Sequence, residues 1–245
     1  MLALFADIHS NLEALRACLK HARASGATRF AFLGDLVGYG ADPQAVISVV
    51  QELAAEGAVV VKGNHDEGVE AGGENMNAAA RAAIDWTQQV LGRDERDFLG
   101  ALPLQVRDGD LCFVHASAAY PERWPYVDSP AAAQVSSEAA QSAYVFSGHV
   151  HHQLLFFESG PARMSAFRPL PGKPVPTGAH RRWLALVGSV GQPRDGNPAA
   201  AYALFDRARQ QLTFRRVPYD NYAAAQKIRA AGLPPQLAYR VERGI

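Results

Sequence analysis

Eight polar residues of the kinds that bind divalent metal ions stand just after short apolar runs of this sequence. They are carboxylates, an amide and imidazoles, with no thiolate among them. Oxygen and imidazole donors suit borderline divalent ions. Two carboxylates, the amide and four of the histidines fill two four-ligand sites only if one carboxylate is shared, as it is in paired hydrolytic metal centres. The set consists of Asp7, His9, Asp35, Asn64, His65, His115, His149 and His151.

Each of these residues also has an ordinary structural interpretation. A lone histidine at a strand end, such as His115, is usually held by hydrogen bonds, and Asp7 could simply cap the helix after it. Gly63-Asn64 is common turn chemistry. The repetition of the pattern at five expected strand ends therefore indicates a shared site more strongly than any one residue does.

The first part of the chain predicts a parallel sheet. Apolar runs at 2–6, 30–33 and 59–61 are expected to be buried strands, each followed by a polar loop. Residues 64–66 would lie on the loop that leaves the third strand. Three strand-then-helix units in succession give parallel strands with right-handed crossovers, so their loops share one edge of the sheet.

Capping residues predict where the first two helices begin. Ser10 is expected to be the N-cap of the first helix, with Glu13 as its capping-box partner. Asp42 and Pro43 are expected to open the second helix, as N-cap and first helical residue.

Two further strands with helices around them follow. Residues 76–99 are rich in Ala and predict one or two covering helices, and Ser129-Pro130 opens another helix. The apolar runs at 111–114 and 144–146 predict strands that deliver the last three histidines of the set.

The pattern changes beyond residue 152. Strand-like runs with short connections and no intervening helix predict antiparallel strands, and five prolines in 160–182 predict an irregular surface excursion that could shape access to the site. A last amphipathic helix is expected near 221–231, followed by a Pro-punctuated tail. The four strand-like runs are 154–157, 183–187, 201–205 and 212–217.

Composition describes an ordinary globular chain of 245 residues, 48% hydrophobic, which we expect to form one domain over 1–245. Lys plus Arg equals Asp plus Glu at 24 each, so nucleic acid and anionic membranes are not favoured as partners. Cys18 and Cys112 are expected to be buried thiols in a reducing compartment, without a disulfide. We find no signal peptide and no 18-residue apolar run, and expect a cytoplasmic protein.

In chain order, the motifs Asp-x-His, Gly-Asp, Gly-Asn-His-Asp, a lone His and Gly-His-x-His resemble the calcineurin-like metallophosphoesterase superfamily. The resemblance covers residues 7 to 151. It implies an α/β (α+β) fold, a four-layer αββα sandwich with two mixed sheets. It also implies two divalent transition-metal ions, whether Mn, Fe, Zn, Co or Ni. Its ligand sets are Asp7, His9, Asp35 and His151 for one ion and Asp35, Asn64, His115 and His149 for the other, with Asp35 bridging and His65 free to face the substrate.

A glycine-rich loop at 188–197 contains Arg194. Similar loops occur in the small bacterial phosphodiesterase and dinucleoside tetraphosphate hydrolase branch, where such an arginine would contact phosphate. A plain hairpin turn fits this stretch equally well. His21, His152 and His180 are interpreted as ordinary structural or surface histidines.

One motif departs from the protein phosphatases of the superfamily, which have Gly-Asp-x-x-Asp-Arg-Gly. Here Gly38 and Tyr39 replace the Asp that would orient His65 and the Arg that would hold a phosphate. A poorly oriented acid matters least for a good leaving group. We therefore expect hydrolysis of phosphodiester or phosphoanhydride bonds in a small phosphorylated substrate, such as a nucleotide or dinucleoside polyphosphate, by attack of a metal-bridging hydroxide.

Two alternatives remain open. One is a phosphomonoesterase, acting on a protein or a small molecule. The other is a non-catalytic binding scaffold of the same fold, which would be expected to lack ligands or the histidine at position 65.

Overall fold

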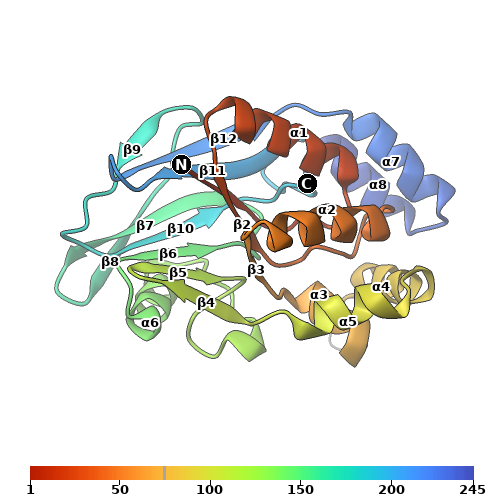
Figure 1. The fold of residues 1–245 in the computed structure, drawn as a ribbon, viewed down its shortest axis with the longest axis horizontal. Helices are drawn as coiled ribbons and strands as arrows, with labels where there is room; N and C mark the ends of the chain where they lie inside the picture. The colour runs from red at the N-terminus through yellow and green to blue at the C-terminus, as the bar shows by residue number, and fades with distance from the viewer. Residues whose placement is uncertain (74–75) are drawn as a thin grey trace.

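The computed structural model describes residues 1–73 and 76–245, and its framework is a pair of mixed sheets that face each other (Figure 1). Each sheet has six strands. In order, sheet A is β3 (Val59–Val61), β2 (Arg29–Leu33), β1 (Leu2–Phe5), β11 (Ala200–Asp206), β12 (Gln211–Val217) and β9 (Pro174–Pro176). In order, sheet B is β4 (Gln105–Asp108), β5 (Leu111–Val114), β6 (Tyr144–Ser147), β10 (Trp183–Val187), β7 (Gln153–Gly160) and β8 (Arg163–Phe167).

Apolar side chains fill the space between the sheets, and β1 is buried on both faces. Alternate residues of β1 point to opposite sides: Leu2 and Leu4 join the cluster between the sheets, whereas Ala3 and Phe5 join the cluster under the helices. A strand with two buried faces needs a continuous apolar run, and residues 2–6 form such a run.

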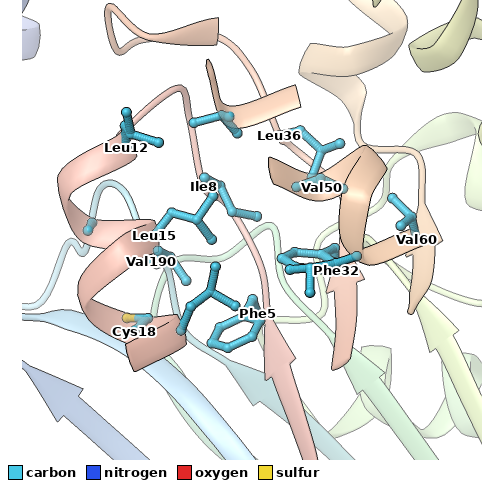
Figure 2. Packing of buried hydrophobic residues seen from close by; sticks show 14 of the residues in the cluster. Phe5, Ile8, Leu12, Leu15, Cys18, Phe32, Leu36, Val50, Val60 and Val190 are labelled. Carbon is cyan, nitrogen blue, oxygen red and sulfur yellow. The ribbon is translucent and has the colours of Figure 1, made fainter. Parts of the chain in front are cut away.

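Helices cover the outer faces of both sheets. Figure 2 shows α1 (Leu12–Ala24) and α2 (Pro43–Ala55) over sheet A, where Leu15, Cys18 and Phe32 lie in one cluster. On sheet B, α6 (Pro130–Ala140) packs Ala133 and Ala140 against Cys112 and other strand residues. The predicted four-layer αββα architecture is therefore confirmed, and both cysteines are buried and free.

The remaining helices gather at one end of the sandwich, on the right in Figure 1, away from β8 and β9. They are α3 (Asn64–Ala71), α4 (Ala78–Val90), α5 (Arg93–Ala101), α7 (Asn221–Ala230) and α8 (Pro235–Arg243). The helices predicted within 76–99 and near 221–231 are confirmed as α4, α5 and α7. The tail forms α8, which the prolines there did not predict. Among the described residues, no helix combines the length and apolarity that a bilayer crossing requires.

The capping prediction for α1 was wrong by one residue. Asn11 is the N-cap, and its Oδ1 accepts the N–H of Ala14 at 3.1 Å. Ser10 has a left-handed backbone with φ +53°, which an N-cap does not adopt, and Glu13 forms an ion pair with Lys227 at 2.5 Å instead of a capping box. Asp42 is the N-cap residue of α2 as predicted, but its carboxylate makes no capping hydrogen bond and pairs with Lys227 instead.

Residues 64–66 were predicted as a loop and instead form the first turn of α3. The reason is Asp66, whose Oδ2 accepts the N–H of Gly63 at 2.9 Å. A carboxylate at the third helical position that reaches back to the N-cap is a helix-start signal, and it overrides the turn preference of Gly-Asn.

The antiparallel prediction for the last strands holds for β7 with β10 and for β11 with β12, and β8 adds a further antiparallel strand beside β7. β10 lies between β6 and β7 and runs parallel to β6. The Pro-rich segment 160–182 is also more regular than predicted, since it contributes β8 and β9. Pro174 and Pro176 are tolerated in β9 because it is an edge strand of sheet A.

The two sheets are joined where their parallel strands end. The N–H of Val190, just after β10 of sheet B, donates to the carbonyl of Ala6 after β1 of sheet A at 2.9 Å. The next residue, Gly191, donates to the carbonyl of Asp7 at the same distance. The strand ends of both sheets therefore open onto one region, which fits the rule that sites in such sheets lie beyond the carboxyl ends of strands.

Candidate metal centre

All eight chemistry-bearing residues predicted from the sequence lie together at these strand ends. Sheet A provides them after β1 and β2 and at the start of α3, and sheet B provides them after β5 and β6. All are buried except Asn64, which is half-buried. The described residues contain three groups whose ligand atoms lie within 4.8 Å of one another.

The first group is Asp7, His9 and His151. Nε2 of His151 lies 3.3 Å from Oδ1 of Asp7 and 3.2 Å from Nε2 of His9. Nδ1 of His9 donates to the carbonyl of Val37 at 3.1 Å, and Nδ1 of His151 donates to that of Gln192 at 2.6 Å. Because a carbonyl only accepts, the proton of each neutral ring is on Nδ1 and both Nε2 atoms present lone pairs. Two lone pairs that face each other are stabilised by a cation between them.

The second group is Asp35, His115 and His149, with Asn64 beside it. Nδ1 of His115 donates to the carbonyl of Leu33 at 2.7 Å, which leaves a lone pair on its Nε2. That Nε2 lies 3.2 Å from Oδ1 of Asn64, 3.2 Å from Nδ1 of His149 and 3.4 Å from Oδ2 of Asp35. Acceptor atoms converge here too, so the donor set fits a second cation.

Asp35 links the two groups through a single oxygen. Its Oδ2 lies 3.6 Å from Nε2 of His9 and 3.4 Å from Nε2 of His115. Its other oxygen, Oδ1, accepts the backbone N–H of His65 at 2.8 Å, which fixes the orientation of the carboxylate. Oδ2 is therefore placed to contact cations in both groups.

Burial of the Asp7 and Asp35 carboxylates favours a positive charge at the centre. It raises the pKa of Asp7 to about 7, because the carboxylate is removed from water and lies near Asp35. Burial alone would lower the pKa of His115, but the adjacent Asp35 carboxylate outweighs it and the net pKa is about 9. Burial lowers the pKa of His149 to about 3. The carboxylate charge of Asp35 therefore favours positive charge beside it.

Left-handed backbone conformations concentrate at the centre. Asp7, His9, Asp35, His149 and His151 have φ between +49° and +67°. Such conformations cost on the order of 1 to 3 kcal/mol each for residues other than glycine and persist where surrounding structure enforces them. Five strained residues that all aim side chains at one point indicate a functional rather than an architectural cluster.

His65 is held by ring contacts rather than by a carboxylate. Its ring centroid is 4.5 Å from that of Tyr39 and 4.8 Å from that of His9. Its buried Nδ1 has no hydrogen-bond partner among the described residues. A Cβ at Gly38, which has φ +84°, would overlap this Nδ1. The orienting carboxylate that the sequence lacks at position 38 would thus find no room in this backbone. His65 also belongs to a third group with His9 and Asp35, so its ring lies within reach of a cation.

Asp66 does not orient His65. Its Oδ1 accepts the N–H groups of Leu36 and Val37 at 2.9 and 3.2 Å, and its Oδ2 accepts that of Gly63. The carboxylate thus ties the loop after β2 to the start of α3. Its role is to shape the backbone that presents Asp35.

Arg194, in the loop 188–197, lies beside the centre. It lines an open pocket of about 550 Å³ together with His65, His151 and other residues of the centre. Its Nη2 donates to Oε1 of Gln192 at 3.1 Å, and its guanidinium lies 5.8 Å from the ring centroid of Tyr39. A cation held at the wall of this pocket can contact an anionic ligand.

Sequence reasoning missed several residues of the site. Gln192, whose carbonyl fixes His151, lies in the glycine-rich loop already singled out for Arg194. Tyr126 stacks on His149, with ring centroids 4.1 Å apart and planes at 20°. Trp124 meets His115 edge-on at 5.8 Å. These aromatic residues belong to an irregular segment with no periodic pattern, so no sequence signal pointed to them.

The three histidines interpreted as ordinary lie outside the two groups. His21 bonds the hydroxyl of Tyr202 at 2.6 Å, and exposed His180 accepts from its neighbour Arg181. His152, also exposed, bonds the carbonyl of Arg194 at 2.8 Å.

Comparison with known proteins agrees with this geometry. Residues 1–210 match the family model for the calcineurin-like phosphoesterase superfamily domain, so the chain belongs to that superfamily. The superfamily comprises metal-dependent hydrolases of phosphoric esters, which the sequence resemblance implied.

The similarity to individual relatives extends over the whole chain. The uncharacterized protein MJ0912 of Methanocaldococcus jannaschii is 34% identical over 251 residues, covering 100% of this chain and 98% of that protein. A crystal structure of a metallophosphoesterase from Sphaerobacter thermophilus is 33% identical with a TM-score of 0.87, over 100% of this chain and 98% of that one. The hypothetical protein PH1004 of Pyrococcus horikoshii OT3 shares the fold, with 21% identity and a TM-score of 0.78, over 100% and 99% of the two chains.

We predict that Asp66→Ala destabilises the fold by on the order of 3 kcal/mol, because three buried N–H groups lose their charged acceptor. The midpoint of urea denaturation measures this. Asp85→Ala removes an exposed aspartate of α4 and serves as the control. Equal midpoints for the two variants would show that the Asp66 contacts contribute nothing to stability.

Proposed function

We propose that this protein is a dinuclear metal-dependent phosphoesterase that hydrolyses phosphodiester or phosphoanhydride bonds. The observation that supports it most directly is the position of Oδ2 of Asp35 between two groups of converging lone pairs. A shared carboxylate of this kind is how hydrolytic metal pairs are held.

The residues present suit two ions of Mn, Fe, Zn, Co or Ni, which favour mixed oxygen and imidazole ligands. Asp7, His9, Asp35 and His151 would hold one ion. Asp35, Asn64, His115 and His149 would hold the other. When bound, the ions would supply Lewis-acid activation of the phosphorus centre and of the attacking water. Because both sheets provide ligands, we also propose that residues 1–245 act as a single domain.

In hydrolysis, a water oxygen forms a bond to phosphorus while the bond from phosphorus to the departing oxygen breaks. His65 is the residue we assign to the departing oxygen, which it would protonate or stabilise by hydrogen bonding. Its place in the pocket beside Arg194 supports this role, with Arg194 contacting a non-bridging oxygen of the substrate.

The surroundings of His65 favour substrates with good leaving groups. Ring contacts with Tyr39 and His9 hold the imidazole, and Gly38 gives it no hydrogen bond. A poor alkoxide leaving group needs a well-oriented acid, whereas a nucleotide phosphate or an aryl oxide departs with little protonation. A diester also carries one negative charge less than a monoester dianion, which suits a pocket in which Arg194 is the only lining Lys or Arg side chain among the described residues. A nucleotide or dinucleoside polyphosphate is therefore the substrate class we propose.

A phosphomonoesterase is the second candidate, because the same two metal ions could also catalyse the hydrolysis of a phosphate monoester. The non-catalytic scaffold is less favoured, since the residues proposed as ligands and His65 are all present and converge.

We predict that Asp35→Asn lowers metal content from two ions per chain to one or none, because the shared ligand loses its charge. Elemental analysis of purified protein measures this. Asp128→Asn changes an exposed aspartate outside the two groups and is the matched control. Retention of two ions with normal turnover in Asp35→Asn would refute the bridging assignment.

We predict that His65→Gln keeps both ions and the fold while kcat falls by roughly 10² to 10⁴, the usual contribution of a positioned acid. Metal content and steady-state kinetics are measured on the same samples. His180→Gln, at an exposed and remote histidine, should match the wild type. Loss of an ion from His65→Gln would instead make His65 a ligand, as its group with His9 and Asp35 would allow.

We predict that kcat/KM for bis(p-nitrophenyl) phosphate and for a dinucleoside polyphosphate exceeds that for an alkyl phosphate monoester under the same metal and pH. The reason is the missing orienting group at Gly38 and the missing arginine at Tyr39. A diester series should show a steep dependence of rate on leaving-group pKa. An alkyl monoester cleaved equally well would move the assignment to the phosphomonoesterase.

A further inference from the structure

A second pocket adjoins the metal pocket and has an empty volume of about 900 Å³. The two pockets share Asn64, Met76, Tyr126 and His149 as lining residues. We call the second one the aromatic compartment and define it by the further residues Glu67, Arg123 and Trp124. A substrate whose phosphorus lies at the metal centre can therefore extend one substituent across His149 into this compartment.

Two aromatic rings line the compartment in fixed positions. The Tyr126 ring stacks on His149, and the residue is still 57% exposed, so it remains accessible to a ligand in the compartment. Trp124 is half-buried, and its indole Nε1 donates to Oε2 of Glu67 at 2.8 Å. Rings held in place lose little conformational freedom when a planar group stacks on them.

Polar groups at the same place complement a nitrogen heterocycle. Among the described residues, Oε2 of Glu67 accepts the indole N–H of Trp124. The other carboxylate oxygen, Oε1, can therefore accept an N–H from a ligand. Arg123 adds a cation at the rim for a hydroxyl or anionic oxygen. Aromatic faces combined with a carboxylate acceptor fit a nucleobase, which has two π-faces and N–H donors at its edge.

We infer that the aromatic compartment binds a nucleobase on the substituent that stays attached to phosphorus. His65 lines the metal pocket but not the compartment, so a substituent bound in the compartment is not the leaving group that the proposed function assigns to His65. This inference rests on the proposed function and narrows its substrate class to nucleotidyl esters. In the reaction, water adds to phosphorus, the bond to the leaving group breaks, and a nucleoside monophosphate is released.

The test compares two diesters with the same leaving group and charge, the p-nitrophenyl ester of adenosine 5′-monophosphate and methyl p-nitrophenyl phosphate. We expect kcat/KM for the adenylyl ester to exceed that for the methyl ester by about tenfold or more, since stacking of one base contributes on the order of 1 to 3 kcal/mol. Tyr126→Leu should reduce this ratio about tenfold, whereas Tyr126→Phe, which keeps the ring, should preserve it.

Tyr222→Leu is the matched control, because Tyr222 is 64% exposed on α7 and lines neither pocket. Metal content is measured for every variant, since Tyr126 touches His149. A wild-type ratio near one, or an unchanged ratio in Tyr126→Leu, would overturn the inference while hydrolysis of the methyl ester still supports the proposed function.

If neither diester is hydrolysed with added metals, the proposed function fails and binding decides the inference. Calorimetry with adenosine 5′-monophosphate and Mn²⁺ would then show weaker binding to Tyr126→Leu than to the wild type. Equal dissociation constants for the two proteins would refute the compartment as a nucleobase site.

Discussion

The carboxylate of Asp35 is the contact on which the geometry of the site depends. One oxygen lies between the histidines of both groups, and the other is fixed by the N–H of His65 at the first turn of α3. A Cβ at Gly63 would overlap this carboxylate, so the strand end after β3 has to approach without a side chain. Asp66, three residues later, bonds the loop that presents Asp35. The end of β2, the end of β3 and the start of α3 therefore form one interlocked unit, with the charge of Asp35 at its centre.

His65 illustrates how packing and hydrogen bonding constrain a side chain differently. The rings of Tyr39 and His9 set the plane of the imidazole, but ring contacts do not select which nitrogen bears the proton. His9, His115 and His151 differ, because a backbone carbonyl holds the proton of each on Nδ1. These three proposed ligands thus have a fixed tautomer, and the proposed acid does not. That division suits ligands that must present a lone pair permanently and an acid that must exchange its proton in each turnover.

The sequence predicted the parts of this structure that depend on local signals. Buried runs such as 2–6 and the polar residues after them located the site, because in parallel sheets the strand ends meet at one edge. The start of α1 was misplaced because Ser10 and Asn11 are both good caps, and only the left-handed loop around His9 decides between them. The parallel placement of β10 could not be predicted, since it follows from pairing with β6 across the chain. Gln192 and Tyr126 belong to the site because of tertiary contacts with His151 and His149, and such contacts produce no periodic pattern in the sequence.

The hydrogen bonds from Val190 and Gly191 to the loop after β1 join the two sheets at the site. In the proposed centre, Asp7 and His151 would share an ion, and that ion would close a loop spanning more than half of the chain. Closing so long a loop removes conformational entropy from the unfolded chain, much as a cross-link does. The ions would then stabilise the folded two-sheet structure in addition to their role in hydrolysis. The free energy of unfolding would rise with free metal concentration, by about 2.7 kcal/mol for an ion at one hundred times its dissociation constant.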